Sequence, residues 1–196
     1  MAKDLTEIIV VLDRSGSMAT IRGDMEGGFN SFIAAQRALP GDCTVTLTQF
    51  DTDYEIVFAG KPLADVPPLT LEPRGATALL EAVSKTITAT GLRLAGLPED
   101  QRPERVLFVI ITDGHENASP PEFTAESVLA MVKHQTERYS WEFVFIGANQ
   151  DAIATAASLG IRNAANFAAT PAGTAKALHG LNVGTSNYRG GKSYGN

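Results

Sequence analysis

The sequence predicts an α/β protein built on a doubly wound sheet of about six strands, mostly parallel, with one antiparallel edge strand and helices on both faces. Continuous apolar runs at 7–12 and 106–111 are typical of strands that are buried on both faces of a parallel sheet. Segments with helical spacing of apolar residues alternate with strand-like segments elsewhere. Only three residues separate the strand-like segments 43–50 and 54–58, which is too few for a parallel crossover and requires a hairpin.

The first helix and the first three strands occupy the N-terminal third of the chain. Apolar residues recur at helical spacing over 25–36, and Pro40 with Gly41 ends that helix. The strand at 43–50 is rich in Thr and Val, which favour strands. The hairpin then places the segment 54–58 antiparallel at one edge of the sheet.

The later elements follow the same alternation. A helical pattern over 79–94 follows a Pro-rich connector, and Gly91 could end that helix early. Thr124 is a suitable N-cap for the helix after the strand at 106–111. The last expected elements are a strand at 141–146, a helix at 151–159, a strand at 163–168 and a helix from Thr170 and Pro171 to about Leu181. Together they predict a Rossmann-like sheet in the order 3-2-1-4-5-6.

The length of 196 residues suits one domain, which we expect over residues 1–183. Residues 184–196 are rich in Gly, Ser and Asn and almost free of apolar side chains, so they predict a flexible C-terminal tail.

Composition and charge exclude several classes. A net charge of −6 disfavours binding to nucleic acid or to an anionic membrane. Cys43 is the only cysteine, so neither an internal disulfide nor a zinc site of the CxxC type can form. No secretory signal and no run of roughly 20 apolar residues is visible. We expect a cytoplasmic protein that is monomeric on its own.

Two buried strands of the expected sheet end in aspartates. Asp13 and Asp113 follow the two apolar runs, and ligands in open α/β sheets bind beyond the carboxyl ends of the strands. Two close carboxylates resist joint ionisation unless a cation lies between them. Ser15 and Ser17 add hydroxyl oxygens, and Gly16 between them permits a tight loop. Hard oxygen ligands favour Mg²⁺, with Mn²⁺ or Ca²⁺ as alternatives, over Zn²⁺ or Cu²⁺.

Three motifs make a resemblance specific. The run from Asp13 through Ser17, followed by Met18, resembles the DxSxS motif of von Willebrand factor type A (vWA) domains. The segment 74–79 resembles the family's later threonine loop, with Ala76 where many relatives carry a second glycine. The segment 110–114 resembles its TDG strand end. Together they resemble a complete metal-ion-dependent adhesion site (MIDAS), and the resemblance extends from about Glu7 to Ala168.

The resemblance implies a role for each residue of the site. Ser15 and Ser17 would bind the metal directly, and Thr77 directly or through water. Asp13 and Asp113 would act mostly through water or as switching ligands. An ion held in this way stays electrophilic and would bind an Asp or Glu side chain of a partner protein.

The residues around the site are candidates for partner contact. We assign to this rim Met18, Arg22, Asp51, His115, Glu116 and Asn117. Other roles remain open, since Asp is common in hairpin turns and the segment 115–117 could be a solvated loop. Ser15 or Ser17 could instead cap the following helix.

The expected function is a Mg²⁺-dependent protein–protein interaction module, an adaptor without enzymatic activity, of the small standalone prokaryotic or phage type. One alternative is a structural subunit of a larger assembly in which the metal only stabilises the fold. A Mg²⁺-dependent phosphotransferase is disfavoured because that chemistry usually needs a second acid where Ser15 stands. No G-x-S-x-G elbow, G-x-G-x-x-G loop or P-loop is present.

Overall fold

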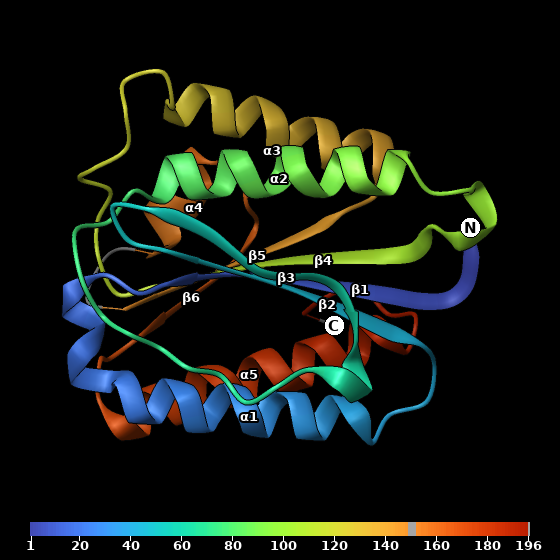
Figure 1. Cartoon of the computed structure of the whole chain (residues 1–196), viewed down its shortest axis with the longest axis horizontal. Helices are drawn as coiled ribbons and strands as arrows, with labels where there is room; N and C mark the ends of the chain where they lie inside the picture. Colours follow the sequence, from blue (N-terminus) through green and yellow to red (C-terminus); the bar gives the residue numbers. More distant parts are fainter. Residues whose placement is uncertain (149–151, 196) are drawn as a thin grey trace.

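The computed structural model describes residues 1–148 and 152–195, and its centre is a six-stranded sheet in the order β3-β2-β1-β4-β5-β6 (Figure 1). All neighbouring strands are parallel except β2 and β3, which form the antiparallel hairpin at one edge. The predicted fold class and strand order are confirmed. The strands are β1 (Ala2–Asp13), β2 (Cys43–Phe50), β3 (Tyr54–Pro62), β4 (Pro103–Thr112), β5 (Glu142–Ala148) and β6 (Asn163–Phe167).

Helices cover both faces of the sheet. Figure 1 shows α1 and α5 on one face, with α2 and α3 on the other. Short 3-10 segments lie at Gly16–Ile21, Leu63–Asp65 and Glu99–Gln101. The helices are α1 (Arg22–Arg37), α2 (Leu79–Ala95), α3 (Ala125–Tyr139), α4 (Ala152–Ser158) and α5 (Pro171–Arg189). None of the helices in the described ranges is long and apolar enough to cross a membrane.

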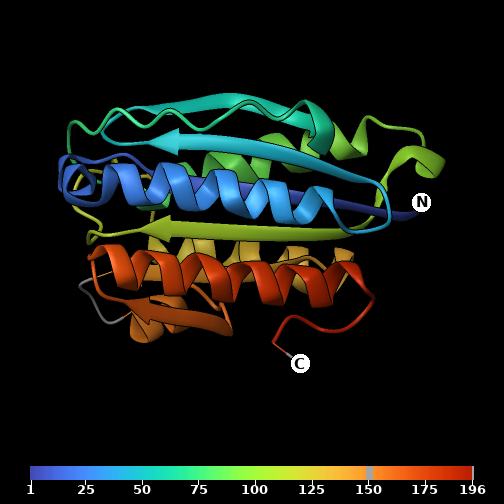
Figure 2. The same ribbon diagram turned by 90° about the horizontal axis from the view of Figure 1, so that it is seen from below.

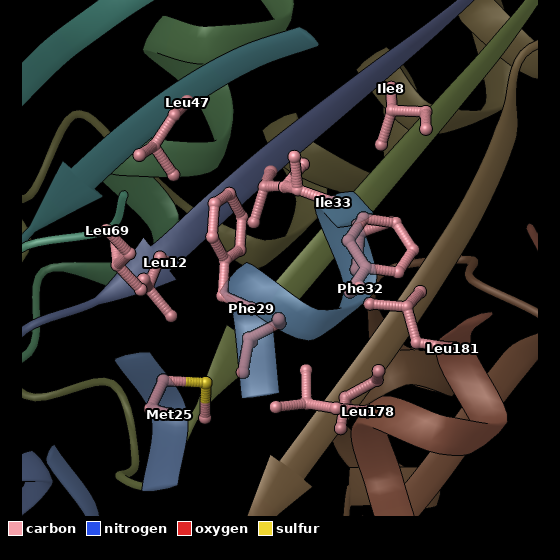
Figure 3. Packing of buried hydrophobic residues seen from close by; sticks show 14 of the residues in the cluster. Ile8, Leu12, Met25, Phe29, Phe32, Ile33, Leu47, Leu69, Leu178 and Leu181 are labelled. Atoms are coloured by element: carbon pink, nitrogen blue, oxygen red, sulfur yellow. The ribbon is translucent and has the colours of Figure 1, made fainter. Parts of the chain in front are cut away.

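Side chains of the central strand β1 alternate between two hydrophobic cores. Ile8 and Leu12 face α1 and α5, whereas Ile9 and Val11 face the α2 side. Figure 3 shows Phe29 and Phe32 of α1 packed in the first core together with Ile8, Leu178 and Leu181. Because β1 is buried on both faces, the chain that leaves its carboxyl end is held in a fixed position.

Helix α5 packs closely on α1. A Cβ at Gly28 would lie only 2.2 Å from a methyl carbon of Leu178, so a side chain there would push the two helices apart. Gln36 of α1 donates hydrogen bonds to the Asn182 side chain at 2.8 Å and to Ser186 Oγ at 3.2 Å. These contacts hold α5 against α1 between Leu178 and Ser186.

The tail predicted over residues 184–196 begins later in the structure, because its first residues belong to α5. Helix α5 continues to Arg189 rather than ending near Leu181, and Tyr188 is buried with its hydroxyl donating to the carbonyl of Val106 at 3.2 Å. The Tyr194 ring packs against Gly184, where a Cβ would meet it at 2.5 Å. Residues with low helix propensity form the end of α5 because tertiary packing compensates for it.

Other boundaries differ less. Helix α2 continues through Gly91, and β1 begins at Ala2 instead of Glu7 because its first residues pair with the extended start of β4. The predicted start of a helix at Asp151 and the last residue of the predicted tail, Asn196, lie outside the described residues.

Candidate metal site

The carboxylate of Asp13 lies at the carboxyl end of β1, fully buried and held on both of its oxygens. One oxygen accepts the backbone N–H of Ser15 at 2.6 Å. The other accepts the hydroxyl of Thr112, the last residue of the neighbouring strand β4, also at 2.6 Å. The sheet therefore fixes Asp13 through its two central strands, and Thr112, to which the sequence assigned no role of its own, is part of the site.

The serine hydroxyls and the second aspartate converge on the same place. Ser17 Oγ donates to Asp113 Oδ1 at 2.6 Å, and the Oγ atoms of Ser15 and Ser17 are 3.2 Å apart. Ser15 is buried and Ser17 is exposed, so these oxygens lie between the protein interior and the surface.

Thr77 is brought to this group by a neighbouring loop. Its backbone N–H donates to Asn117 Oδ1 at 2.9 Å, and the Asn117 N–H donates to the carbonyl of Thr77 at 3.0 Å. A Cβ at Gly114 would lie 3.0 Å from Thr77 Oγ1 and 3.8 Å from Ser17 Oγ, which places both hydroxyls beside the backbone after Asp113. The structure thus brings together all five residues predicted as ligands.

Gly75 gives the threonine loop its shape. It has a φ of +65°, and a Cβ there would lie 2.7 Å from Thr52 Oγ1. Its carbonyl accepts the backbone N–H of Gly16 at 3.2 Å, so the loop before Thr77 is tied to the loop between Ser15 and Ser17.

Both aspartates of the site are harder to ionise than ordinary carboxyl groups. Burial raises the pKa of Asp13 to about 6, against the lowering effect of its hydrogen bonds from Thr112 and Ser15, and the nearby Asp113 charge raises it further. Burial also raises the pKa of Asp113, against the hydrogen bond from Ser17. Among the described residues, no Lys, Arg or His pairs with either carboxylate. The site therefore concentrates negative charge that the protein does not itself neutralise.

Arg14 stands between Asp13 and Ser15, yet its charge is used elsewhere. Its guanidinium donates to Asp51 Oδ2 at 2.7 Å and to Glu55 at 2.5 Å. Asp51 also accepts from Arg74 at 3.0 Å. Burial alone would raise the pKa of Asp51, but hydrogen bonds from the Asp53 N–H and from both guanidinium groups lower it instead. The carboxylate of Asp51 thus joins the serine loop, the β2–β3 hairpin and the start of the threonine loop.

The predicted rim is only partly at the surface. Met18 is fully buried in the core with α1, and Asp51 is buried in its ion pairs, so neither presents its side chain to a partner. The hairpin-turn role considered for Asp51 is present, because it accepts the Asp53 N–H at 2.8 Å. His115 is exposed.

Three further rim residues have contacts of their own. Arg22 is exposed and pairs with Glu26 at 3.3 Å. Asn117 is exposed but holds Thr77. Glu116 accepts the Leu80 N–H at 2.8 Å, at the N-terminus of α2, where a carboxylate is stabilised by the helix dipole. Glu116 therefore contributes mainly to holding the start of α2 in place. The partners of Glu116 and Asn117 are 36 and 40 residues away in the sequence, so no pattern of neighbouring residues predicts these contacts.

No cluster of three or more His, Cys, Asp or Glu suited to a metal ion occurs within the described ranges. This is consistent with the candidate site, since only two of its five residues are of those types and the other three are hydroxyls. These five side chains supply only oxygen ligands, which hard cations prefer, and no sulfur or imidazole nitrogen ligand for a softer cation.

No protein-family model matches the chain, and no curated protein matches it by sequence. Solved structures do match. Proximal thread matrix protein 1 from the mussel byssus is 14% identical with a TM-score of 0.67, over 93% of this chain and 46% of that one. The von Willebrand factor type A protein of Catenulispora acidiphila is 15% identical with a TM-score of 0.61, and the match covers 93% of this chain and 43% of that one. Manganese-loaded TRAP protein of Plasmodium vivax is 14% identical with a TM-score of 0.60, and the match covers 91% of this chain and 73% of that one.

These similarities define the class of protein by its fold. The chain has a vWA-like α/β fold, with a six-stranded sheet and one antiparallel edge strand. It spans less than half the length of the first two proteins. One of the mussel structures has a zinc-occupied MIDAS motif, so metal-loaded structures are among the proteins that share this fold.

Proposed function

We propose that this domain binds one divalent cation, Mg²⁺ in the cell, and through it a carboxylate of a partner protein. The observation that carries the proposal is the convergence of two carboxylates and three hydroxyls at the carboxyl ends of β1 and β4. We assign ion binding to Asp13, Ser15, Ser17, Thr77 and Asp113, which would form a complete MIDAS.

The donor chemistry supports a hard cation. All five side chains offer oxygen, and both carboxylates are buried without a basic partner in the described part of the chain. A bound cation would remove the cost of ionising them together. Mn²⁺ and Ca²⁺ also accept such ligands, and the neighbours with zinc and manganese support divalent binding in general.

The exposure of the site supports a partner that supplies an anion. Ser17, Gly75 and His115 are exposed, so the oxygen cluster has an outward side. Both oxygens of Asp13 already accept hydrogen bonds, so the proposed ion would be contacted largely by hydroxyls and would present a positive centre that an Asp or Glu side chain can reach. Charged contacts of this kind give specificity to an interface.

The geometry supports a binding module over an enzyme. Asp13 is buried with both oxygens engaged, so its carboxylate is not available as a nucleophile. Ser17 hydrogen-bonds a carboxylate rather than a histidine base. A cytoplasmic adaptor that is monomeric on its own completes the proposal.

The first test measures the binding of Mg²⁺ to the domain. Calorimetric titration with Mg²⁺ should show one site in the wild type and none in Asp13→Ala or Asp113→Ala. Arg22→Ala is the control, because this exposed residue is outside the proposed ligand set and pairs with Glu26 at the surface. Wild-type protein without Mg²⁺ binding would refute the proposal.

The second test asks whether peptides bind to the domain through a carboxylate. A random peptide library is selected on the immobilised domain in Mg²⁺ and eluted with EDTA. The eluted peptides should share an Asp or Glu whose amide counterpart no longer binds. If EDTA releases no peptides, or if the released peptides bind equally well as their amide counterparts, carboxylate binding is refuted. Either result would favour the structural alternative, in which the metal only stabilises the fold.

A further inference from the structure

The sheet has two edge strands, and they differ in how they resist the addition of another strand. The pairing of β3 with β2 contains register shifts, and β3 ends in Lys61 and Pro62, all of which hinder pairing at an edge. β6 pairs with β5 in unbroken register over its five residues and contains no charged residue, proline or glycine. Its outer edge has no strand partner within residues 1–148 and 152–195, and Figure 2 shows it at the border of the molecule beside α5.

Two grooves lie on either side of β6. One, of about 690 Å³, lies against α5 and includes Phe167 and Leu181 in its lining. The other, of about 590 Å³, lies toward α3 and α4 and includes Leu129 and Ile153. Arg162 lines both grooves, so they open on opposite faces of the same strand edge.

This arrangement fits an added strand. Successive side chains of a strand point to opposite faces, so a segment paired with β6 would direct them alternately into the two grooves. Apolar surface is already exposed there, since Ile153 is 60% and Leu129 39% exposed. The central residues of a paired segment would therefore be apolar.

The charged residues near β6 indicate which kind of segment would bind there. All 22 Asp and Glu residues of the chain precede residue 152, so the charged side chains of residues 152–195 are all Lys or Arg. Arg162 and Lys176 line the α5-side groove and have no hydrogen bond or ion pair with any described residue. In the other groove Glu137 is already paired with Lys133 at 3.9 Å. A second copy of this chain would oppose like charges across β6, and an acidic segment would not.

We propose that β6 is a docking edge for an extended acidic segment of a partner protein. The main chain of the segment pairs with the free edge of β6, and its central apolar side chains enter the two grooves. Its flanking carboxylates pair with Arg162 and Lys176. This site is separate from the candidate metal site and does not depend on an ion.

The test uses a labelled synthetic peptide of four alternating valines and isoleucines, with two glutamates at each end. Binding is measured by fluorescence anisotropy in EDTA, on wild type and on Asp13→Ala, so that the metal site cannot hold the carboxylates. The peptide should bind both proteins alike. Amide hydrogen exchange should slow at residues 163–167.

Charge variants test the chosen partner. Arg162→Glu with Lys176→Glu should weaken binding about tenfold, because two attractive contacts become repulsive. The same double variant should prefer a peptide with lysines in place of the glutamates. Lys192→Glu is the matched control, since this exposed cation lines neither groove, and it should leave binding unchanged.

Backbone methylation tests the pairing itself. Methylation of alternate amides blocks one edge of the peptide, in either of two isomers, and methylation of every central amide blocks both edges. The peptide with both edges blocked should lose binding, whereas at least one isomer with a single blocked edge should retain it. Undiminished binding of the peptide with both edges blocked, equal binding of glutamate and lysine peptides, or no binding of the parent peptide would overturn the proposal. Concentration-dependent dimers with slowed exchange at 163–167 would assign the edge to a second copy and would also overturn it.

Discussion

Asp13→Asn is expected to stabilise the metal-free protein at neutral pH while it abolishes ion binding. Burial raises the pKa of Asp13 from 3.8 to about 6, which corresponds to about 3 kcal/mol lost on ionising it in the folded state, at about 1.4 kcal/mol per pH unit. An Asn has the same shape and no charge. Its oxygen can accept the Ser15 N–H, and its amide can donate to Thr112, whose hydroxyl can then donate to the Gly114 carbonyl at 3.1 Å.

The direction of the pH dependence follows from the raised pKa. The carboxyl of Asp13 contributes stability that is fully present below pH 3.8 and is lost as the pH rises through about 6. Wild type and Asp13→Asn should therefore have similar free energies of unfolding near pH 4. Above about pH 7 the Asn variant should be more stable by about 2–3 kcal/mol, slightly less than the full ionisation cost because hydrogen bonds are exchanged.

Urea unfolding in EDTA across this pH range measures the difference, and repeating it in Mg²⁺ should raise only the wild-type stability. Thr112→Val is a useful companion, since it removes the hydroxyl that lowers the Asp13 pKa and should destabilise the ionised wild-type site. An Asn variant that is less stable than wild type in EDTA at neutral pH, or a difference that does not change with pH, would refute the reasoning.

Three other changes test Thr77, the ion pairs of Asp51 and the end of α5. Thr77→Ala should weaken Mg²⁺ binding in calorimetry but change metal-free stability by less than about 1 kcal/mol, because its hydroxyl has no hydrogen-bond partner among the described residues; a larger loss in EDTA would make Thr77 structural. Asp51→Asn should cost about 2 kcal/mol near neutral pH by leaving Arg14 under-neutralised. Because the pKa of Asp51 is lowered, this cost should fade as pH drops below 3.8 in urea unfolding, and a constant cost would contradict it. Tyr188→Phe should cost about 1 kcal/mol through the lost bond to Val106, and an unchanged melting temperature would indicate that the end of α5 is not held there.

The order of the strands could be predicted because the relevant signals are local. The short gap of the β2–β3 hairpin and the two apolar runs set the topology without any knowledge of distant contacts. The capped starts of α3 and α5 at Thr124 and Thr170 are equally local, and both are confirmed by side-chain hydrogen bonds.

The end of α5 and the role of Asp51 could not be predicted in the same way. Gly184 and its polar neighbours have low helix propensity, and they are helical because Tyr188 and Tyr194 pack on distant parts of the chain. Asp51 lies 37 residues from Arg14, so its ion pair exists only once the sheet has formed. Burial of Met18 likewise depends on how the 3-10 segment after Ser15 turns toward α1.

The reciprocal hydrogen bonds between Thr77 and Asn117 join two loops that are 40 residues apart in sequence. Neither loop can shift alone without breaking both bonds, so the two behave as one mechanical unit. A movement of Thr77 toward or away from the oxygen cluster carries with it the segment that leads from β4 to α3. The exposed side chain of His115 belongs to that segment. On the proposed function, a change at the surface offered to a partner would therefore be transmitted to the interior that is proposed to hold the ion.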